Sequence, residues 1–321
     1  MSLLVLSHDD VHGLLDMESC IAAMEDVLAA LARDKLTMPL RFMVRSGGDQ
    51  IMGLMPAHRA GDAPLFSLKE IVVTPGNSAR GLDPHQGGVL LHDGETGLLQ
   101  AVVNASAITE IRTAAVSAVA TKLLARPGAR RVAILGAGVQ GHSHAVAMRA
   151  VVPDAELRIW SRTPAHAEAL ALESHATVSA TVEEALDGAE IVCTCTSARE
   201  PIVRLAWLGP GAHLNVVGSS IATARELDAD VVAASALFVD RRESTLNEGG
   251  DYLMAVEEAG IGPDHIRAEL GELLVGSRPG RSDETELTVF KSLGLAVEDL
   301  AAAALCVERA RERDIGTEVA F

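Results

Sequence analysis

The chain has 321 residues, 48% of them hydrophobic, so we expect a packed globular protein large enough for two domains rather than a disordered one. A formal net charge of −17 repels a phosphate backbone, and aromatic residues make up only 2% of the chain, so nucleic acid is not an expected partner. No apolar run approaches the ~18 residues of a membrane span, and no basic segment of a signal peptide precedes the first acids, which predicts a cytoplasmic protein without membrane contact.

The first third of the chain predicts a helix followed by a sheet. Apolar residues recur at helical spacing over residues 16–33, behind an acidic start. Between residues 40 and 103, short strand-like runs alternate with turn segments such as SGGD and DGETG, a pattern typical of a mostly antiparallel sheet. An alanine-rich stretch over residues 109–125 predicts a long helix.

From residue 130 the pattern changes to alternating strands and helices. The apolar runs RRVAIL, ELRIWS, EIVCTCT, AHLNVVG and ALFVD are separated mostly by helical stretches, which predicts an α/β fold with a parallel sheet covered on both faces. Residues 288–313 predict a final long helix. The Pro-Gly pair at residues 127–128 marks a domain boundary.

A complete G-x-G-x-x-G turn, GAGVQG, follows the first of these strands. Gly136 allows the tight turn, Gly138 lets the backbone approach a pyrophosphate, and Gly141 lets the next helix pack on the strand. The start of that helix, at Val139 and Gln140, offers backbone N–H groups to phosphates. Because a strand precedes the turn and a helix follows it, the motif predicts dinucleotide binding; the alternative is an ordinary glycine-rich turn.

The segment LRIWSRTPAH, residues 157–166, follows at the distance where such folds usually carry an acid for the cofactor's ribose. Here the chain has Ser161, Arg162 and Thr163 instead. Arg162 can pair with a 2′-phosphate, to which Ser161 and Thr163 can donate hydrogen bonds, so we expect NADP(H) rather than NAD. The alternative is that Arg162 is a solvated loop residue.

Motifs along nearly the whole chain resemble the ornithine cyclodeaminase/mu-crystallin family. They are, in order, GLMPA, SLKEIV, LDPHQGGVLLHDGETG, TEIRTAAVSAVATKLLARPGARRVAILGAGVQGHSHA, LNVVGSS, RELDADVV and TVFKSLGLAVEDL. The resemblance implies a Rossmann-type doubly wound parallel sheet over residues 127–298. It is inserted in a second α/β domain for substrate binding and dimerisation, residues 1–126 plus 299–321. It also implies a homodimer that acts on α-amino or α-imino acids.

The resemblance also implies roles for individual residues. Arg41 in PLRFMV and Arg112 in IRTAA match the arginines that hold the substrate carboxylate. Lys69 in SLKEIV and Asp228 in RELDADVV match the catalytic pair. Cofactor contacts are implied for Thr113, as a phosphate contact, and for the VFKSLG turn beside the nicotinamide, at Ser292 and Gly294.

The chemistry suits these residue types. Two arginines can clamp a carboxylate by charge-assisted hydrogen bonds. Reduction of a C=N bond requires an iminium, whose proton Asp228 could hold if it lies partly buried beside a lysine, and Lys69 could move a proton or polarise the carboxylate. The structural alternatives are surface ion pairs for Arg41, a strand-edge position for Lys69 and a helix cap for Asp228.

Two departures place the chain closest to the mu-crystallin, or ketimine reductase, branch. Gly53 stands where ornithine-cyclising members tend to carry a glutamate for the distal amine, and the ribose-binding acid is absent. The favoured function is therefore an NADPH-dependent reductase of cyclic imino acids such as 1-pyrroline-2-carboxylate. The alternatives are an ornithine cyclodeaminase or alanine-type dehydrogenase using NAD, and a non-catalytic carrier of a small ligand.

No metal site is expected from the spacing of histidines and cysteines. His142 and His144 lie two positions apart on a helix and so point to different faces. Cys193 and Cys195 have no second cysteine or histidine pair at a suitable spacing, and they are better read as small hydrophobic residues of a buried strand.

Overall fold

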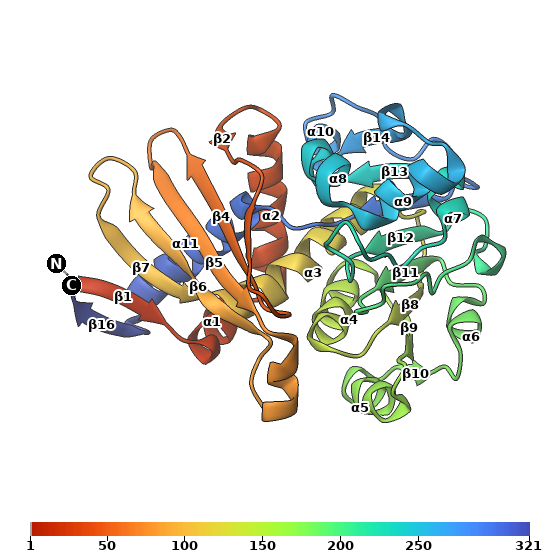
Figure 1. Ribbon diagram of the computed structural model, residues 1–321, viewed down its shortest axis with the longest axis horizontal. Helices are drawn as coiled ribbons and strands as arrows, with labels where there is room; N and C mark the ends of the chain where they lie inside the picture. Colours follow the sequence, from red (N-terminus) through yellow and green to blue (C-terminus); the bar gives the residue numbers. More distant parts are fainter. Residues whose placement is uncertain (1) are drawn as a thin grey trace. The chain divides into compact units, whose positions relative to one another are not determined.

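The structure is a computed structural model that describes residues 2–321, and its chain divides into two compact units (Figure 1). The first unit consists of Met1–Arg112 and Leu295–Phe321, and the second of Thr113–Gly294. The α/β class with a Rossmann-type parallel sheet, predicted from the sequence, is confirmed. Among the helices of residues 2–321, none is long and apolar enough to span a membrane.

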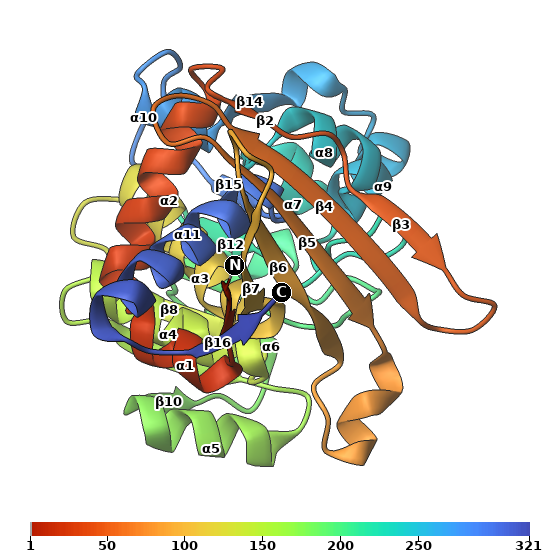
Figure 2. The same ribbon diagram turned by 90° about the vertical axis from the view of Figure 1, so that its left-hand side faces the viewer.

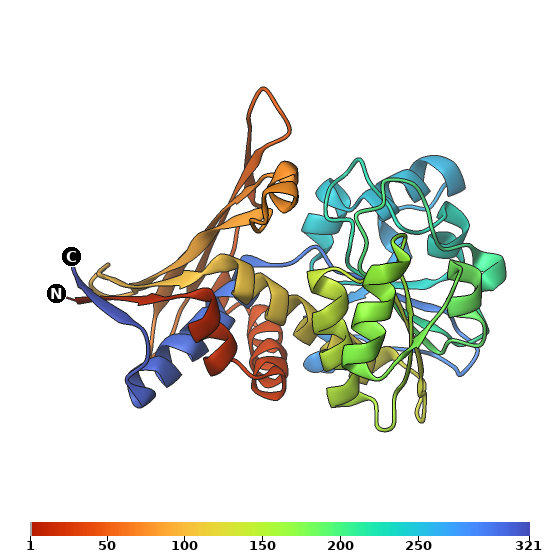
Figure 3. The ribbon, with the colours of Figure 1, turned by 90° about the horizontal axis from the view of Figure 1, so that it is seen from below.

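The first unit is a mostly antiparallel sheet with helices against one face (Figure 3). Its only parallel pairing within the described residues joins β1 to β7, and β1 also pairs with β16, which brings the two ends of the chain side by side (Figure 2). Helix α11 packs against α2 and against β4, β5 and β6. The strand order is β16 (Thr317–Ala320), β1 (Ser2–Leu6), β7 (Leu99–Asn104), β6 (His85–Asp93), β5 (Leu65–Val73), β4 (Ile51–Arg59) and β2 (Leu36–Thr37), with β3 (Phe42–Arg45) also on β4; the helices are α1 (His8–Leu14), α2 (Met17–Leu31), α11 (Ala296–Arg313) and the 3-10 helix η1 (Pro75–Arg80).

Strand β5 shows how this sheet directs side chains. Ser67, Lys69 and Ile71 are buried while their neighbours are partly buried or, at Phe66, exposed, as expected when successive side chains point to opposite faces. Because α11 packs against β5, the face that buries an apolar core also buries the lysine. Because side chains alternate between the two faces of β5, Lys69 points into the interior of the first unit.

The second unit is a wholly parallel sheet of eight strands. Its central strands are buried along their whole length, as expected when helices cover both faces. The strand order is β10 (Thr177–Val178), β9 (Glu156–Trp160), β8 (Arg131–Leu135), β11 (Ile191–Thr194), β12 (His213–Val216), β15 (Thr288–Lys291), β13 (Ala236–Val239) and β14 (Ile266–Glu269). The helices are α4 (Val139–Val151), α5 (Pro164–Ser174), α6 (Val182–Leu186), α7 (Ala229–Ala234), α8 (Arg242–Glu248), α9 (Gly250–Ala259) and α10 (Leu270–Leu274), with the 3-10 helices η2 (Leu205–Trp207) and η3 (Pro263–His265).

Helix α3 (Ala105–Leu124) runs from one unit into the other. The predicted domain boundaries lie at 126/127 and 298/299, whereas the chain divides between the compact units at 112/113 and 294/295. The second half of α3 belongs to the parallel-sheet unit because its polar side chains are bonded there: Asn215 Nδ2 of β12 donates to Thr121 Oγ1 at 2.9 Å. The returning helix α11 belongs entirely to the first unit.

The prediction of one helix over residues 288–313 is wrong in its first part. Residues Thr288–Lys291 form β15, buried between β12 and β13, and α11 begins only at Ala296. A β-branched and aromatic run suits a pleated buried strand, and Gly294, at φ 80°, turns the chain before the helix. The predicted long helix at 109–125 exists but begins earlier, at Ala105.

Candidate active site

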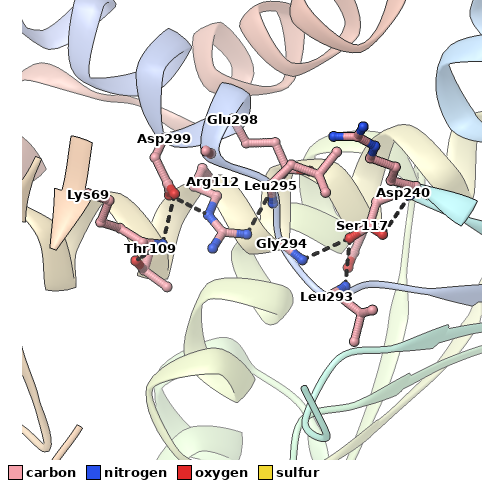
Figure 4. A network of polar contacts seen from close by, with 12 residues as sticks. Lys69, Thr109, Arg112, Ser117, Asp240, Leu293, Gly294, Leu295, Glu298 and Asp299 are labelled. Carbon is pink, nitrogen blue, oxygen red and sulfur yellow. Dashed lines mark hydrogen bonds and ion pairs between the residues drawn. The ribbon is translucent and has the colours of Figure 1, made fainter. Parts of the chain in front are cut away.

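Lys69 lies in a buried cluster of charges in the first unit (Figure 4). Its Nζ is 2.8 Å from Asp299 Oδ2 and donates to Thr109 Oγ1 at 3.4 Å. The lysine side chain is 3% exposed and that of Asp299 1%. Strand β5, helix α3 and helix α11 thus each bring one polar side chain to the same point, so the predicted strand-edge alternative for Lys69 does not hold.

Burial lowers the pKa of Lys69 to about 8. The carboxylate of Asp299 opposes this shift, and the positive charge of Arg112 adds to it. An amine with a pKa near neutrality can give up or accept a proton under physiological conditions. The cluster can therefore support acid–base chemistry.

Arg112 is held rigidly in the same cluster. Its Nε donates to Asp299 Oδ1 at 3.0 Å, and its Nη1 donates to Glu298 Oε2 at 2.9 Å. Glu298 also accepts from the backbone N–H of Leu295, at the start of α11. The guanidinium is thus oriented by two carboxylates before any ligand arrives.

Glu298 and Asp299 are site residues that the sequence patterns did not predict. Both stand in the VEDL segment of a recognised motif, but acids in the first turn of a helix are common because they interact favourably with the helix dipole. What distinguishes them is that both are buried. Arg41, the other predicted carboxylate ligand, lies in the segment just before β3 of the same unit, where its side chain is half-buried.

The glycine turn of the second unit has the geometry that a dinucleotide needs. Gly136 has φ 111°, and a Cβ there would stand 2.4 Å from the carbonyl oxygen of Cys195; a Cβ at Gly141 would stand 2.1 Å from the carbonyl oxygen of Gly136. A Cβ at Gly138, in contrast, would meet nothing within 4 Å. Gly138 caps α4, and no side chain occupies the cap of that helix. The two outer glycines serve the fold, and the middle one faces open space at a helix N-terminus, so the turn fits a pyrophosphate.

Ser161, Arg162 and Thr163 follow β9, the strand beside the glycine-turn strand β8. Ser161 is half-buried, and its Oγ accepts from the backbone N–H of Thr163 at 3.4 Å. Arg162 is exposed, and among the described residues its guanidinium has no hydrogen bond or ion pair. A cation thus stands at the position where the ribose-binding acid of other dinucleotide folds is found.

Asp228 occupies the N-cap position of α7, two residues after Glu226, whose side chain bonds to residues at the ends of β11 and β12. Its side chain is half-buried and makes no cap hydrogen bond. The predicted lysine neighbour is not its ion partner: the buried lysine of the second unit, Lys291, pairs with Asp251 at 3.0 Å.

Buried polar groups hold the loop that carries Asp228. Asp251 Oδ1 accepts from the backbone N–H groups of Glu226 and Leu227, at 2.8 and 3.0 Å. Lys291 Nζ also donates to the carbonyl oxygen of Ser219. The chain is therefore fixed on the N-terminal side of Asp228, through residues that the sequence analysis did not single out.

Glu226 ties this loop to the ends of two strands. It accepts hydrogen bonds from Thr194 Oγ1, from the backbone N–H and Oγ1 of Thr196, and from the backbone N–H of Gly218, all between 2.6 and 2.8 Å. Burial raises the pKa of Glu226 above its usual range, although Lys291 opposes the shift. Both carboxylate oxygens of Glu226 accept hydrogen bonds from these donors, so its role is to hold the loop against the ends of the two strands.

The remaining predicted cofactor contacts lie in the same unit. Asp240 Oδ2 accepts from the backbone N–H groups of Leu293 and Gly294, at 2.6 and 2.8 Å, which anchors the turn that contains Ser292. Thr113 is buried on α3, directly after Arg112. Ser292 is buried as well and donates its backbone N–H to Val216 at 3.0 Å.

His144 was considered only as a metal ligand, and the structure gives it another role. Its ring is buried, with Nδ1 2.7 Å from the carbonyl oxygen of Gln140 and Nε2 2.9 Å from Ser117 Oγ. Burial lowers the pKa of His144 to about 4, so the ring is neutral. A neutral imidazole thus joins the helix of the glycine turn to α3.

Comparison with known proteins agrees with this architecture. The ornithine cyclodeaminase/mu-crystallin family model matches residues 1–314. Ketimine reductase mu-crystallin of Rattus norvegicus is 41% identical over 307 residues, 94% of this chain and 95% of that protein.

Two solved structures cover the whole fold. The Δ1-pyrroline-2-carboxylate reductase of Thermococcus litoralis, in complex with NADH and L-proline, is similar with a TM-score of 0.94 and 34% identity, covering 99% of this chain and 100% of that one. An archaeal alanine dehydrogenase dimer with bound NAD has a TM-score of 0.94 and 29% identity, with both chains covered completely. The chain belongs to the ornithine cyclodeaminase/mu-crystallin family.

Proposed function

We propose that this protein is a nicotinamide-dependent reductase of cyclic α-imino acids such as 1-pyrroline-2-carboxylate, with NADPH as the preferred cofactor. The observation that carries the proposal is the buried lysine with a near-neutral pKa, held by Asp299 beside an oriented arginine. The reductases and the proline-bound structure among its relatives support the same substrate class.

In this proposal the first unit handles the substrate. Arg112, oriented by Glu298 and Asp299, and Arg41 bind the carboxylate of the imino acid. Because the positive charge of Arg112 lies beside Lys69, a bound carboxylate would offset part of that charge and favour the protonated amine. Binding of the substrate would thereby favour protonation of Lys69, and the reduction of the substrate requires a proton.

The second unit holds the cofactor in this proposal. The first turn of α4, at Val139, Gln140 and Gly141, receives the pyrophosphate, and the anchored turn of Ser292 and Gly294 lies beside the nicotinamide, with Thr113 as a phosphate contact. The bound nicotinamide supplies the hydride. Asp228 holds or donates the proton that makes the imine an iminium, with Lys69 as the second candidate for that proton.

The preference for NADPH rests on the cation after β9. Arg162 is exposed and, in residues 2–321, has no carboxylate partner, so a 2′-phosphate would not have to displace one. Ser161 and Thr163 offer hydroxyl groups on either side. A guanidinium and two hydroxyls suit a phosphate better than a ribose hydroxyl.

Ring closure of a diamino acid such as ornithine is less well supported. A Cβ at Gly53 of β4 would meet Ile71 Cγ2 at 3.5 Å, Met43 Sδ at 3.6 Å and the carbonyl oxygen of Ile71 at 4.0 Å, none of which is a carboxylate. A cationic distal amine placed there would lose its hydration without gaining a carboxylate, which is costly.

We also propose a homodimer. Strands β3 and β5 expose apolar side chains on the first unit, with Phe42 65%, Val44 56% and Phe66 46% exposed. Phe42 and Val44 lie on the same face of β3, and neighbouring exposed apolar side chains are typical of protein interfaces. Light scattering on a sizing column is expected to give twice the mass of the chain, and a monomer mass for the Phe42→Asp, Val44→Asp double variant.

The test of the activity is a substrate panel measured with both cofactors. We expect NADPH oxidation with 1-pyrroline-2-carboxylate and its six-membered homologue, and little turnover of ornithine or alanine in the presence of oxidised cofactor. Turnover of ornithine would favour a cyclodeaminase, and tight binding without turnover would favour a carrier.

The proton donor is tested separately by single-turnover NADPH oxidation. Asp228→Asn keeps the size of the side chain but cannot give up a proton, so the rate should fall by roughly 10²-fold while NADPH still binds. A wild-type rate in this variant would assign the proton to Lys69.

A further inference from the structure

Two histidines and a glutamate meet at the surface of the first unit, in a group to which the proposed reaction assigns no role. His8 and His12 lie on α1, and Glu110 lies on α3. One ligand atom from each of the three residues falls within 4.8 Å of the other two. This is the one group of its kind among residues 2–321.

The local sequence fixes the two histidines on one face of α1. Ser7 caps the helix and forms a capping box with Asp10, so the short helix has a defined start. Residues four apart on a helix are neighbours, and the two imidazole rings stand 4.6 Å apart at an interplanar angle of 38°. Both rings remain partly exposed, so an ion in solution can reach them.

The spacing suits a tetrahedral metal ion. Glu110 Oε2 is 3.5 Å from His12 Nε2 and 3.9 Å from His8 Nε2. Ligand bonds of about 2.0–2.1 Å in a tetrahedron place ligand atoms about 3.3–3.5 Å apart. The two distances to Glu110 are therefore close to those of a bound ion, and the ligand atoms of the two imidazoles, within 4.8 Å of one another, can approach by rotation of their partly exposed side chains.

A further contact is of the kind that supports metal ligands. His8 Nδ1, the ring nitrogen turned away from Glu110, is 3.4 Å from Asp9 Oδ1. Metal-binding histidines commonly donate their second ring N–H to a carboxylate, which fixes the tautomer and makes the ligand more basic. The simpler reading is a surface ion pair between protonated His12 and Glu110, and the pKa of His12 is indeed raised, chiefly by its hydrogen bond with Glu110. An ion pair, however, would not require the second histidine at the same carboxylate.

We propose that His8, His12 and Glu110 bind one divalent first-row transition-metal ion, with Zn²⁺ as the representative, and that the fourth position is left to water. Two imidazoles and one carboxylate are a known zinc ligand set. The ion would join α1 to the turn of α3 that also carries Thr109, the hydrogen-bond acceptor of Lys69.

The test uses the full-length, untagged protein, stripped with a chelator and dialysed against Zn²⁺ at pH 8. One bound Zn²⁺ per chain is expected. Loss of a supporting contact outside the ligand set typically costs ~10–100-fold in metal affinity, so loss of a ligand in His12→Gln or Glu110→Gln should cost at least ~10-fold.

The matched control is His142→Gln. His142 also pairs with one glutamate, Glu173, at 3.0 Å, but it has no second histidine. Zinc binding should be unchanged in this variant.

Visible absorption of the Co²⁺-substituted protein provides a second readout, since a four-coordinate nitrogen and oxygen site absorbs far more strongly than hexaaqua Co²⁺. Failure of the wild-type chain to bind one equivalent of Zn²⁺, or equal binding by the His8→Gln, His12→Gln and Glu110→Gln variants, would overturn the proposal. None of these readouts uses the reductase activity, so their outcome is independent of the proposed function.

Discussion

Each unit buries one lysine against one aspartate, and the two pairs differ in what surrounds them. Lys69 and Asp299 stand 2.8 Å apart in the first unit, and Lys291 and Asp251 stand 3.0 Å apart in the second. Both lysines are at most 3% exposed. The two ion pairs are alike in distance and burial, so any difference in their properties must come from the residues around them.

Around Lys69 the additional neighbour is a cation. The charge of Arg112 adds to the effect of burial, and together they bring the pKa of Lys69 to about 8. Around Lys291 the neighbours are a second carboxylate, Glu226, and the carbonyl oxygen of Ser219. The first arrangement leaves Lys69 with the lowered pKa that the proposed proton transfer requires, whereas the second holds loops in place.

The largest effect on activity is expected from Lys69→Met. The variant removes a group proposed to transfer a proton, and such a group is worth about 10²–10⁴-fold in kcat. Asp299 keeps Arg112 at Oδ1 but loses the cation at its buried Oδ2, so the melting temperature should fall as well, while the fold is retained. Steady-state kcat and a thermal melt check both parts, and wild-type turnover in this variant would reduce Lys69 to a structural residue.

Lys291→Met is expected to lower the free energy of unfolding more than it lowers the activity. It leaves Asp251 and Glu226 buried without the cation between them, and breaking a buried pair in this way costs ~3–5 kcal/mol of the free energy of unfolding. The measurement is the urea midpoint of the second unit, followed by tryptophan fluorescence, because both tryptophans, Trp160 and Trp207, belong to it. An unchanged midpoint with abolished turnover would place Lys291 in the chemistry instead.

Arg162→Ala tests the cofactor half of the proposal. Loss of a charge-assisted contact with a phosphate should cost about 1.5–3 kcal/mol, or roughly 10- to 100-fold in KM for NADPH. The KM for NADH should not change, because NADH carries no 2′-phosphate. A wild-type enzyme that uses NADH equally well would contradict the assignment.

The smallest effect is the pH dependence. Since the pKa of Lys69 is lowered to about 8, the protonated amine is present below that pH and is lost as the pH rises through it. Imine reduction that draws on this proton should therefore slow above pH 8, by a few-fold to ~10-fold per pH unit. The pH profile of kcat/KM measures this because it reports the free enzyme, and the residual activity of Lys69→Met should lack the limb.

Local patterns predicted much of this molecule because their physical causes are local. The glycine turn needs a positive φ at Gly136 and a close approach at Gly141, and both requirements are visible in the letters GAGVQG. Alternation along β5 marks one face of a strand, and strand–helix alternation after residue 130 marks a parallel sheet. The recognised motifs pointed to Lys69 and Arg112, which the structure joins through Asp299.

Other features depended on partners distant in sequence. The sequence of Thr288–Lys291 is apolar and could continue as a helix into α11. These residues form a strand because they pair with β12 on one side and β13 on the other. The carboxylates that hold Arg112 lie 186 and 187 residues away along the chain. No periodicity carries information over such a separation.

The sequence by itself determined the fold class, the cofactor turn and the identity of the charged residues, because backbone sterics and burial periodicity act over a few residues. The tertiary structure decided which charges meet. The pKa of Lys69, the orientation of Arg112 and the meeting of His8 and His12 with Glu110 all arise where separate elements pack together. Electrostatic interactions between side chains depend on distance and burial in space, and only the packed chain sets both.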